Sequence, residues 1–362
     1  MMKSGIVILA ALACSVSDAA HAQSANGIWV NAHELATLPM SGPAWTALKT
    51  RADAAAPIPN LADQSQHDNI YVLAKALVYA RTGDVHYRAA VIDLCMRAIN
   101  TELGGRTLAL GRKLAAYVIA AELVVLPPDQ NAIFRTWLRR TLSEPLDGET
   151  LQSTHERRPN NWGTHAGASR AAVAAYLGDM GELNRTAQVF KGWLGDRAAY
   201  AKFSYGELSW QCDAFQPVGV NPPGCMKAGH LIDGVVPDDQ RRGGTFVWPP
   251  FQENYVWEAL QGAVAQAEIL NRFGFDTYNW SSRALLRAVA WLHVEDGFPA
   301  TGDDSWEPHT VNFQYATTFF APVPSQPGKN VGFSDWTHGP GRVRAAPAPV
   351  PDLMPPPVPL PH

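Results

Sequence analysis

The strongest constraint on the fold is a repeated pairing of apolar helical segments, each of which ends at glycine or proline. From Asp68 onward, apolar residues recur at helical spacing until Gly83, and a second helical segment follows at once. A further pair lies on either side of Pro127-Pro128. Each pair is therefore predicted to form a helical hairpin.

Similar endings return along the whole chain. Gly83, Gly178 and Gly274 each follow an apolar helical segment and are spaced about 95 residues apart, which leaves room for two hairpins per interval. Helical patterns resume over 253–272 and 281–294, and alternating strand patterns are scarce. The sequence therefore predicts an all-α fold of stacked helical hairpins.

One long segment, 205–251, interrupts this pattern with glycine, proline, tryptophan and aspartate. A loop of this length inside a compact domain usually has a function. Cys212 and Cys225 lie within it, close enough in sequence to bridge it in an oxidising compartment. We therefore expect a disulfide between them, whereas Cys95 sits among apolar residues at helical spacing and should be a buried thiol.

The two ends of the chain are predicted to lie outside the folded domain. Residues 1–22 have one lysine, a short apolar run and small residues before a cleavage point after Ala22, which is typical of a secretory signal peptide. The proline-rich end predicts a disordered tail over 340–362. We expect one domain over 23–339, in a periplasmic or secreted protein that has no membrane contact after signal cleavage.

Composition narrows the possible partners. The net charge of −4 argues against nucleic acid. Beyond the signal peptide, no apolar stretch approaches the length needed to span a membrane. No Cys/His spacing resembles a zinc site, so we expect no metal cofactor.

A dense polar cluster opens one of the helices, in the stretch RPNNWGTHAGASR. If a helix starts near Asn161, then Asn161 and His165 lie one turn apart on the same face, above small side chains. Alternatively, Asn160 or Asn161 only caps the helix and His165 is a hydrogen-bonded core residue. The presence of Arg158 and Trp162 beside them favours a binding or catalytic site.

A second cluster follows in HLIDGVVPDDQRRGGTFVWPPFQENYVWEAL, over 230–260. Arg241 and Arg242 lie in its glycine-rich part. Tyr255 opens a helix whose same face continues through small residues, which leaves room for a ligand beside the phenol. The alternative is a surface arginine pair and a tyrosine that only packs.

Together these features resemble the alginate lyase-like superfamily of bacterial polysaccharide lyases. The resemblance extends from about Gly27 to His338, and is carried by GIWVNAHELATLP, the NNW stretch, DGVVPDDQRRGG followed by NYVWEAL, and PGKNVGFSDWTH. It implies an (α/α) toroid with a substrate groove across one end. It also implies β-elimination of a uronate-containing polysaccharide, an anionic partner, commonly without a metal.

The resemblance also implies residue roles. The family's alginate lyases have histidine directly after an asparagine pair, whereas this chain has Trp162 there and a histidine one helical turn later. Arg241 is a close alternative to Arg242 for the family's arginine. The predicted catalytic residues are Tyr255, His165, Asn161 and Arg242, and the predicted substrate-binding residues are Asn160, Arg241, Trp162, Trp248 and Arg158.

This set of residues suits the removal of a proton from C5 of a uronic acid. That proton is barely acidic while the neighbouring carboxylate stays fully charged, so an amide and a guanidinium would stabilise the enolate-like charge of the transition state. Tyr255, activated by a nearby guanidinium, would take the C5 proton and protonate the departing O4. His165 would assist as a second base or by neutralising charge.

Two other functions remain open at this stage. Helical toroids also carry glycoside hydrolases, for which the catalytic acids would come from Glu207, Asp213, Asp303 or Asp304. A glycan-binding protein without turnover would depend on tryptophan and arginine instead. The stretch GDDSWEPH, which contains Asp303, Asp304 and Glu307, is expected to be a solvated acidic turn more than a part of the groove.

Overall fold

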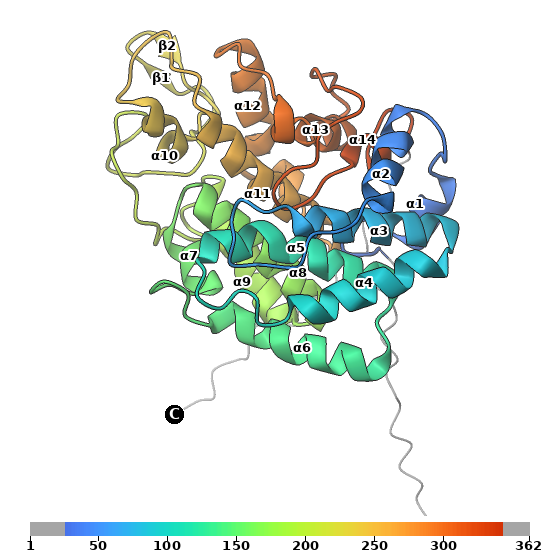
Figure 1. The fold of residues 1–362 in the computed structure, drawn as a ribbon. Helices are drawn as coiled ribbons and strands as arrows, with labels where there is room; N and C mark the ends of the chain where they lie inside the picture. Colours follow the sequence, from blue (N-terminus) through green and yellow to red (C-terminus); the bar gives the residue numbers. More distant parts are fainter. Residues whose placement is uncertain (1–25, 343–362) are drawn as a thin grey trace, which may run out of the picture.

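The computed structural model describes residues 26–342, and most of these residues are helical (Figure 1). The predicted signal peptide and nearly all of the proline-rich tail lie outside the described residues. Within the described part, no helix combines the length and the apolar character needed to cross a bilayer.

The elements follow one another in a simple order, with long helices before and after a largely irregular segment. The first helices are α1 (Ala32–Thr37), α2 (Pro43–Asp53), α3 (Asp68–Thr82), α4 (Val85–Ala98), α5 (Thr107–Val124), α6 (Pro128–Ser143), α7 (Leu151–Arg157), α8 (Asn161–Leu177) and α9 (Met180–Trp193). The rest are β1 (Met226–Lys227), β2 (His230–Leu231), α10 (Pro237–Gln240), η1 (Arg241–Gly243), α11 (Asn254–Arg272), η2 (Thr277–Asn279), α12 (Trp280–Val294), η3 (Gly302–Asp304), α13 (Glu307–Tyr315) and α14 (Ser334–Thr337).

The long helices form two layers. α3, α5, α8 and α11 are buried on nearly all sides, and each packs against the next in this order. α4, α6, α9 and α12 each bury only one face, as expected for helices on the outside of the ring. The result is an incomplete (α/α) toroid, so the predicted all-α fold of helical hairpins is confirmed.

Two glycines allow the inner helices to approach closely. A Cβ atom at Gly111 in α5 would lie 2.9 Å from the backbone nitrogen of Ala166 in α8. A Cβ atom at Gly262 in α11 would lie 2.3 Å from the carbonyl carbon of Thr164. Since neither distance leaves room for a side chain, α8 is held tightly between α5 and α11.

The irregular segment over 205–251 matches the loop predicted from composition. It contains only the short α10 and η1 helices and an antiparallel pair in which Met226 faces Leu231. Cys212 and Cys225, the pair expected to bridge this loop, form a disulfide with their Cα atoms 5.9 Å apart. Cys95 is a buried free thiol, as predicted.

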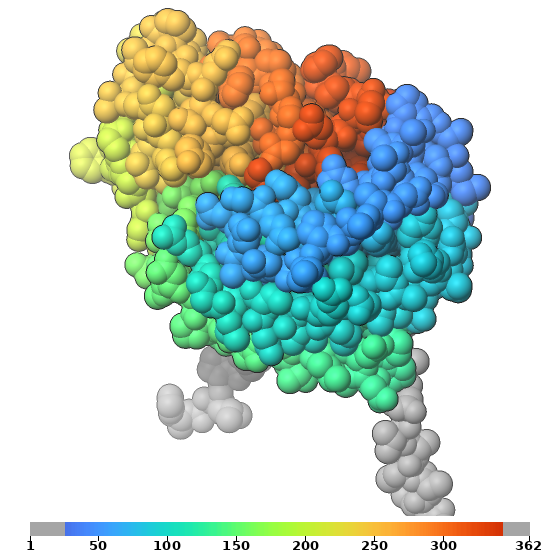
Figure 2. Space-filling view, in the orientation of Figure 1, coloured from blue at the N-terminus to red at the C-terminus, as the bar shows by residue number. Residues whose placement is uncertain are grey.

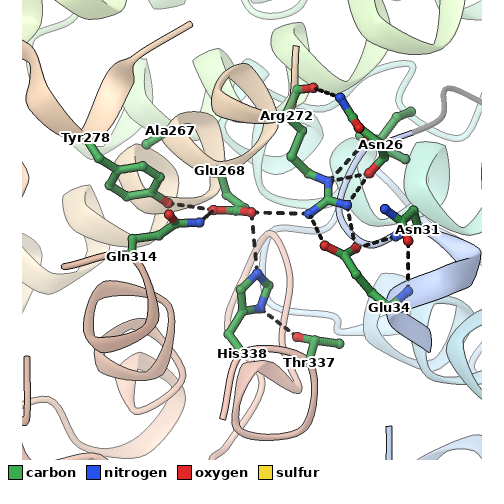
Figure 3. Close-up of polar contacts among 12 residues, drawn as sticks. Asn26, Asn31, Glu34, Ala267, Glu268, Arg272, Tyr278, Gln314, Thr337 and His338 are labelled. Carbon is green, nitrogen blue, oxygen red and sulfur yellow. Dashed lines mark hydrogen bonds and ion pairs between the residues drawn. The ribbon is translucent and has the colours of Figure 1, made fainter. Parts of the chain in front are cut away.

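A buried polar network joins both ends of the described chain to α11 (Figure 3). The carboxylate of Glu268 on α11 is contacted by Tyr278, Gln314, Arg272 and His338. Arg272 also places Nη2 2.6 Å from Oε2 of Glu34 in α1. Burial would raise the pKa of Glu268, but the hydrogen bond and charge of His338 and the charge of Arg272 lower it to about 2.

Glu268→Gln is expected to lower the free energy of unfolding by about 3 kcal/mol near neutral pH, because His338 and Arg272 lose their shared anion. The pKa of this carboxyl is about 2 in the fold against an ordinary 4.5. The contribution of Glu268 to the free energy of unfolding is therefore complete above pH 4.5, and it is lost as the pH falls toward 2. Urea denaturation should show the difference between variant and wild type shrinking as the pH drops through this window. A constant difference would contradict the assignment.

Candidate active site

The first turn of α8 carries the asparagine pair. Asn160 is the helix cap, and its Oδ1 accepts a hydrogen bond from the backbone N–H of Trp162 at 3.2 Å. Asn161 is only 1% exposed, and neither its side-chain oxygen nor its nitrogen has a hydrogen-bond partner among the described residues. A buried amide without partners is costly, so Asn161 is suited to bind a polar ligand at this helix end.

The first turn of α11 carries Tyr255. The side chain of Glu253 caps this helix by accepting a hydrogen bond from the backbone N–H of Tyr255 at 3.1 Å. Tyr255 is 39% exposed. A phenol at this level of exposure is accessible to a substrate that lies over the helix end.

The two neighbouring arginines lie in different environments. The guanidinium carbon of Arg242 lies 3.8 Å from the centroid of the Tyr255 ring. Arg241 instead places Nε 2.9 Å from Oδ1 of Asp238, and its guanidinium packs over Gly206. Of the two arginines considered in the sequence, Arg242 is the one that contacts Tyr255.

His165 lies one turn along α8 from Asn161, as predicted, but it is completely buried. Its Nδ1 lies 2.5 Å from Oδ1 of Asn330, and the Nδ2 of Asn330 donates to the carbonyl of Gly111 at 2.7 Å. Its Nε2 lies 3.3 Å from Oε2 of Glu258. Burial is the largest influence and lowers the pKa of His165. With both ring nitrogens occupied, His165 is placed to hold other groups in position.

Glu258 was not anticipated from the sequence, although it is central to this region. Its Oε2 accepts a hydrogen bond from Nη2 of Arg112 in α5 at 2.6 Å, and its Oε1 lies 3.7 Å from Nζ of Lys329. Burial would raise the pKa of Glu258, but His165, Arg112 and Lys329 lower it to about 2. The one sequence signal was its position three residues after Tyr255, on the same face of α11.

Two contacts join the beginning of α8 to the segment that carries Arg242 and to the helix that carries Tyr255. The backbone N–H of Asn161 donates to Oδ1 of Asp239 at 3.2 Å, three residues before Arg242. His165 contacts Glu258, three residues after Tyr255. The amide, the arginine and the tyrosine are thus carried by elements that are connected through these buried side chains.

Of the remaining predicted binding residues, Trp162 and Trp248 are half-buried and Arg158 is exposed. The guanidinium of Arg158 lies 5.1 Å from the ring of Trp162. Trp248 stacks on His230 with 4.3 Å between ring centroids. By contrast, five other tryptophans lie in the core, namely Trp137, Trp210, Trp257, Trp306 and Trp336.

The acidic stretch near 303 was expected to be a solvated turn. This prediction is wrong for Asp304 and Glu307, which are buried. Asp304 is 2% exposed and accepts a hydrogen bond from Nε2 of Gln261 at 2.6 Å. Burial raises the pKa of Asp304 to about 7 and that of Glu307 well above its usual range. These carboxyls are buried because the stretch forms η3 and the start of α13, which pack against α11.

The other candidate acids of the hydrolase interpretation are exposed loop residues. Glu207 accepts a hydrogen bond from the backbone N–H of Ser209 at 2.7 Å, and Asp213 from that of Phe215 at 2.8 Å. Such short-range contacts are typical of turns. In the described part of the chain, no group of three or more His, Cys, Asp or Glu side chains is arranged to hold a metal ion.

Comparison with known proteins supports the resemblance seen in the sequence. A model of the alginate lyase family matches residues 73–199, which include the start of α8. This segment is alginate lyase-like. The match indicates a polysaccharide lyase, the enzyme class expected from the sequence. No curated protein sequence matches the chain significantly.

Solved structures of alginate lyases share the fold. An alginate lyase from Bacteroides ovatus aligns with a TM-score of 0.52 at 14% identity, over 81% of this chain and 93% of that one. Alginate lyase A1-III from Sphingomonas species A1 aligns with a TM-score of 0.51 at 11% identity, over 86% and 91%. A variant of alginate lyase A1-III in complex with a tetrasaccharide aligns with a TM-score of 0.50 at 10% identity, again over 86% and 91%.

Proposed function

We propose that this protein is an exported lyase that cleaves a uronate-containing polysaccharide, of the alginate or glucuronan type, by β-elimination. The observation that carries the proposal is the contact between the Arg242 guanidinium and the ring of the exposed Tyr255. Arg242 places a positive charge beside the Tyr255 ring, and the helix of Tyr255 packs against α8, which carries the buried Asn161 amide that has no hydrogen-bond partner among the described residues. This combination suits proton abstraction next to a carboxylate.

The proposed reaction uses three groups of this chain. Asn161 and Arg242 would hydrogen-bond the uronate carboxylate and stabilise the negative charge that spreads onto it in the transition state. The Tyr255 oxygen would take the proton from C5, whose electron pair forms the C4=C5 bond as the C4–O4 bond breaks. The same oxygen would then return its proton to O4 of the departing sugar.

The other predicted residues would bind or position the substrate. Trp162 and Trp248 present partly exposed rings on which sugar faces can stack. Arg158 adds positive charge beside the Trp162 ring, Arg241 adds a charge held by Asp238, and Asn160 caps the helix that presents Asn161. His165 would act through Glu258, because it is buried and its ring nitrogens are both occupied.

Export belongs to the same proposal. The predicted signal peptide would direct the chain to the periplasm or the medium, where such polymers are encountered. The Cys212–Cys225 disulfide supports this location, since disulfides persist mainly in oxidising compartments. Mass spectrometry of the mature protein, expected to begin after Ala22, tests the cleavage directly.

Ultraviolet absorbance of the new C4=C5 bond tests the reaction itself. Digestion of a panel of polyuronates should produce this absorbance with at least one polymer. A hydrolase that acts on unsaturated uronyl sugars would instead remove the absorbance, and a glycan-binding protein without turnover would leave it unchanged. Either of these two results would reject the lyase.

Glu258→Gln is expected to lower kcat/KM by roughly tenfold, a cost of about 1.4 kcal/mol. The reason is that Arg112, Lys329 and His165 lose the charge that holds them together. Because the pKa of Glu258 is about 2, the wild type carries this charge throughout the neutral range, so the loss should not vary with pH there. Steady-state kinetics from mildly acidic to mildly basic pH measure this, and Glu258→Asp should recover part of the rate. An unchanged kcat/KM in Glu258→Gln would show that Glu258 has no role in the reaction.

A further inference from the structure

A cavity lies at the start of α3, against the segments around 303 and 326. It has a volume of about 390 Å³, which is within the usual range of small-ligand sites, roughly 300–1,000 Å³. It lies where the beginning and the end of the described chain meet, the blue and the orange-to-red segments of Figure 2. Its wall includes Arg51, His67, Ile70, Asp303, Gln326 and Pro327.

A single lysine connects this cavity to Glu258 of the candidate active site. The ammonium of Lys329 forms an ion pair with Asp303 on the cavity wall, and it also lies 3.7 Å from Oε1 of Glu258. Glu258 in turn contacts His165 and lies three residues after Tyr255. The cavity wall is therefore connected through Lys329 to Glu258, on the helix that carries Tyr255.

The charge in this cavity suits an anion. Lys329 offsets Asp303, which leaves Arg51 as the uncompensated charge of the wall. Arg51 has no hydrogen bond or ion pair with any other described residue, and its guanidinium lies 4.7 Å from the centroid of the Tyr71 ring. This contact with the ring face orients the side chain while its N–H donors remain unused.

The other groups of the wall suit a sugar unit. His67 is an exposed residue, but partial burial of its imidazole, together with the positive charge of Lys329, lowers its pKa. A neutral imidazole can both donate to and accept from sugar hydroxyls. Pro327 is half-buried and adds apolar surface against which the ring of a sugar can pack, whereas Ile70 is buried beneath the wall.

We infer that this cavity is a second carboxylate-binding subsite, in which Arg51 binds the uronate of a sugar unit near the one that is cleaved. This inference rests on the proposed function, because it assumes a polyuronate substrate. It predicts that affinity increases with chain length as an oligomer becomes long enough to reach Arg51. A guanidinium–carboxylate contact contributes about 1.5–3 kcal/mol, which corresponds to at least tenfold in affinity.

The test measures binding with oligouronates of defined length in the full chain. Saturated oligomannuronates and oligoglucuronates, from disaccharide to hexasaccharide, are titrated calorimetrically into wild type, Arg51→Gln and Arg51→Lys. We expect Arg51→Gln to bind the longer oligomers at least tenfold more weakly than wild type, with little change for the disaccharide. Arg51→Lys, which keeps the charge, should lose less. Arg97→Gln is the matched control, since Arg97 is an exposed arginine on α4 paired with Asp93.

The outcomes separate this inference from the lyase itself. Equal affinities of wild type and Arg51→Gln at every length, or no binding of any oligouronate by wild type, would overturn the subsite. A length-dependent loss in Arg51→Gln without any C4=C5 absorbance from wild type would support the subsite and reject the elimination. If Arg51→Gln unfolds at a lower temperature than the Arg97→Gln control, Arg51→Lys is used in its place. A weaker increase of affinity with oligomer length in Arg51→Lys than in wild type supports the subsite, and the same increase overturns it.

Discussion

Replacement of Tyr255 by phenylalanine is expected to lower kcat by about a thousandfold while leaving the fold and substrate binding intact. The change deletes only the phenol oxygen, which in the proposed reaction carries the proton from C5 to O4. The ring remains, so Arg242 keeps the aromatic face against which its guanidinium lies. Because Tyr255 is 39% exposed and opens a capped helix, the loss of its hydroxyl should cost little stability.

The measurement is the rate of C4=C5 absorbance at saturating polymer, together with calorimetric affinity for a saturated oligouronate. Tyr79→Phe is the matched control, because Tyr79 is a partly buried tyrosine on α3 that packs against the hydrophobic core. A Tyr255→Phe protein that retains near-normal kcat would remove Tyr255 from the chemistry. A large loss of affinity with unchanged kcat would make it a binding residue instead.

Much of the fold could be predicted because its determinants are local. The helix that starts at Asp68 ends where Gly83 adopts a left-handed conformation with φ 73°, and α8 ends in the same way at Gly178 with φ 66°. Apolar spacing and a glycine stop are both visible in a short window of sequence. The long irregular segment was also predictable from composition, since it lacks any helical period.

The site could be predicted only in part, because contacts between distant segments decide the rest. Arg241 and Arg242 are adjacent, and only the fold reveals that Arg241 pairs with Asp238 while Arg242 reaches Tyr255. Glu258 acquires its importance from Arg112, which is 146 residues away in the sequence. The burial of Glu307 depends in the same way on packing against α11, which no local pattern indicates.

Arg242→Ala is expected to lower kcat/KM by about a hundredfold to a thousandfold, which is typical when one group that stabilises a developing oxyanion is removed. Two effects combine. The substrate carboxylate loses a guanidinium that contacts it before and during the reaction, so KM rises and kcat falls together. Tyr255 also loses the guanidinium that lies 3.8 Å from its ring centroid, a contact that helps to hold the ring in place.

Arg241→Ala is the matched comparison for this prediction, because it removes the same side chain one position earlier. Arg241 is held by Asp238 and packs over Gly206, away from the contact with Tyr255, so its removal should cost much less activity. Arg242→Lys should recover part of the binding, since a charge returns, but little of the rate, since an ammonium cannot reproduce the planar donor geometry of a guanidinium. If Arg241→Ala lowers kcat/KM more than Arg242→Ala does, the roles of the two arginines are reversed. The substrate would then reach Tyr255 from the side of Asp238.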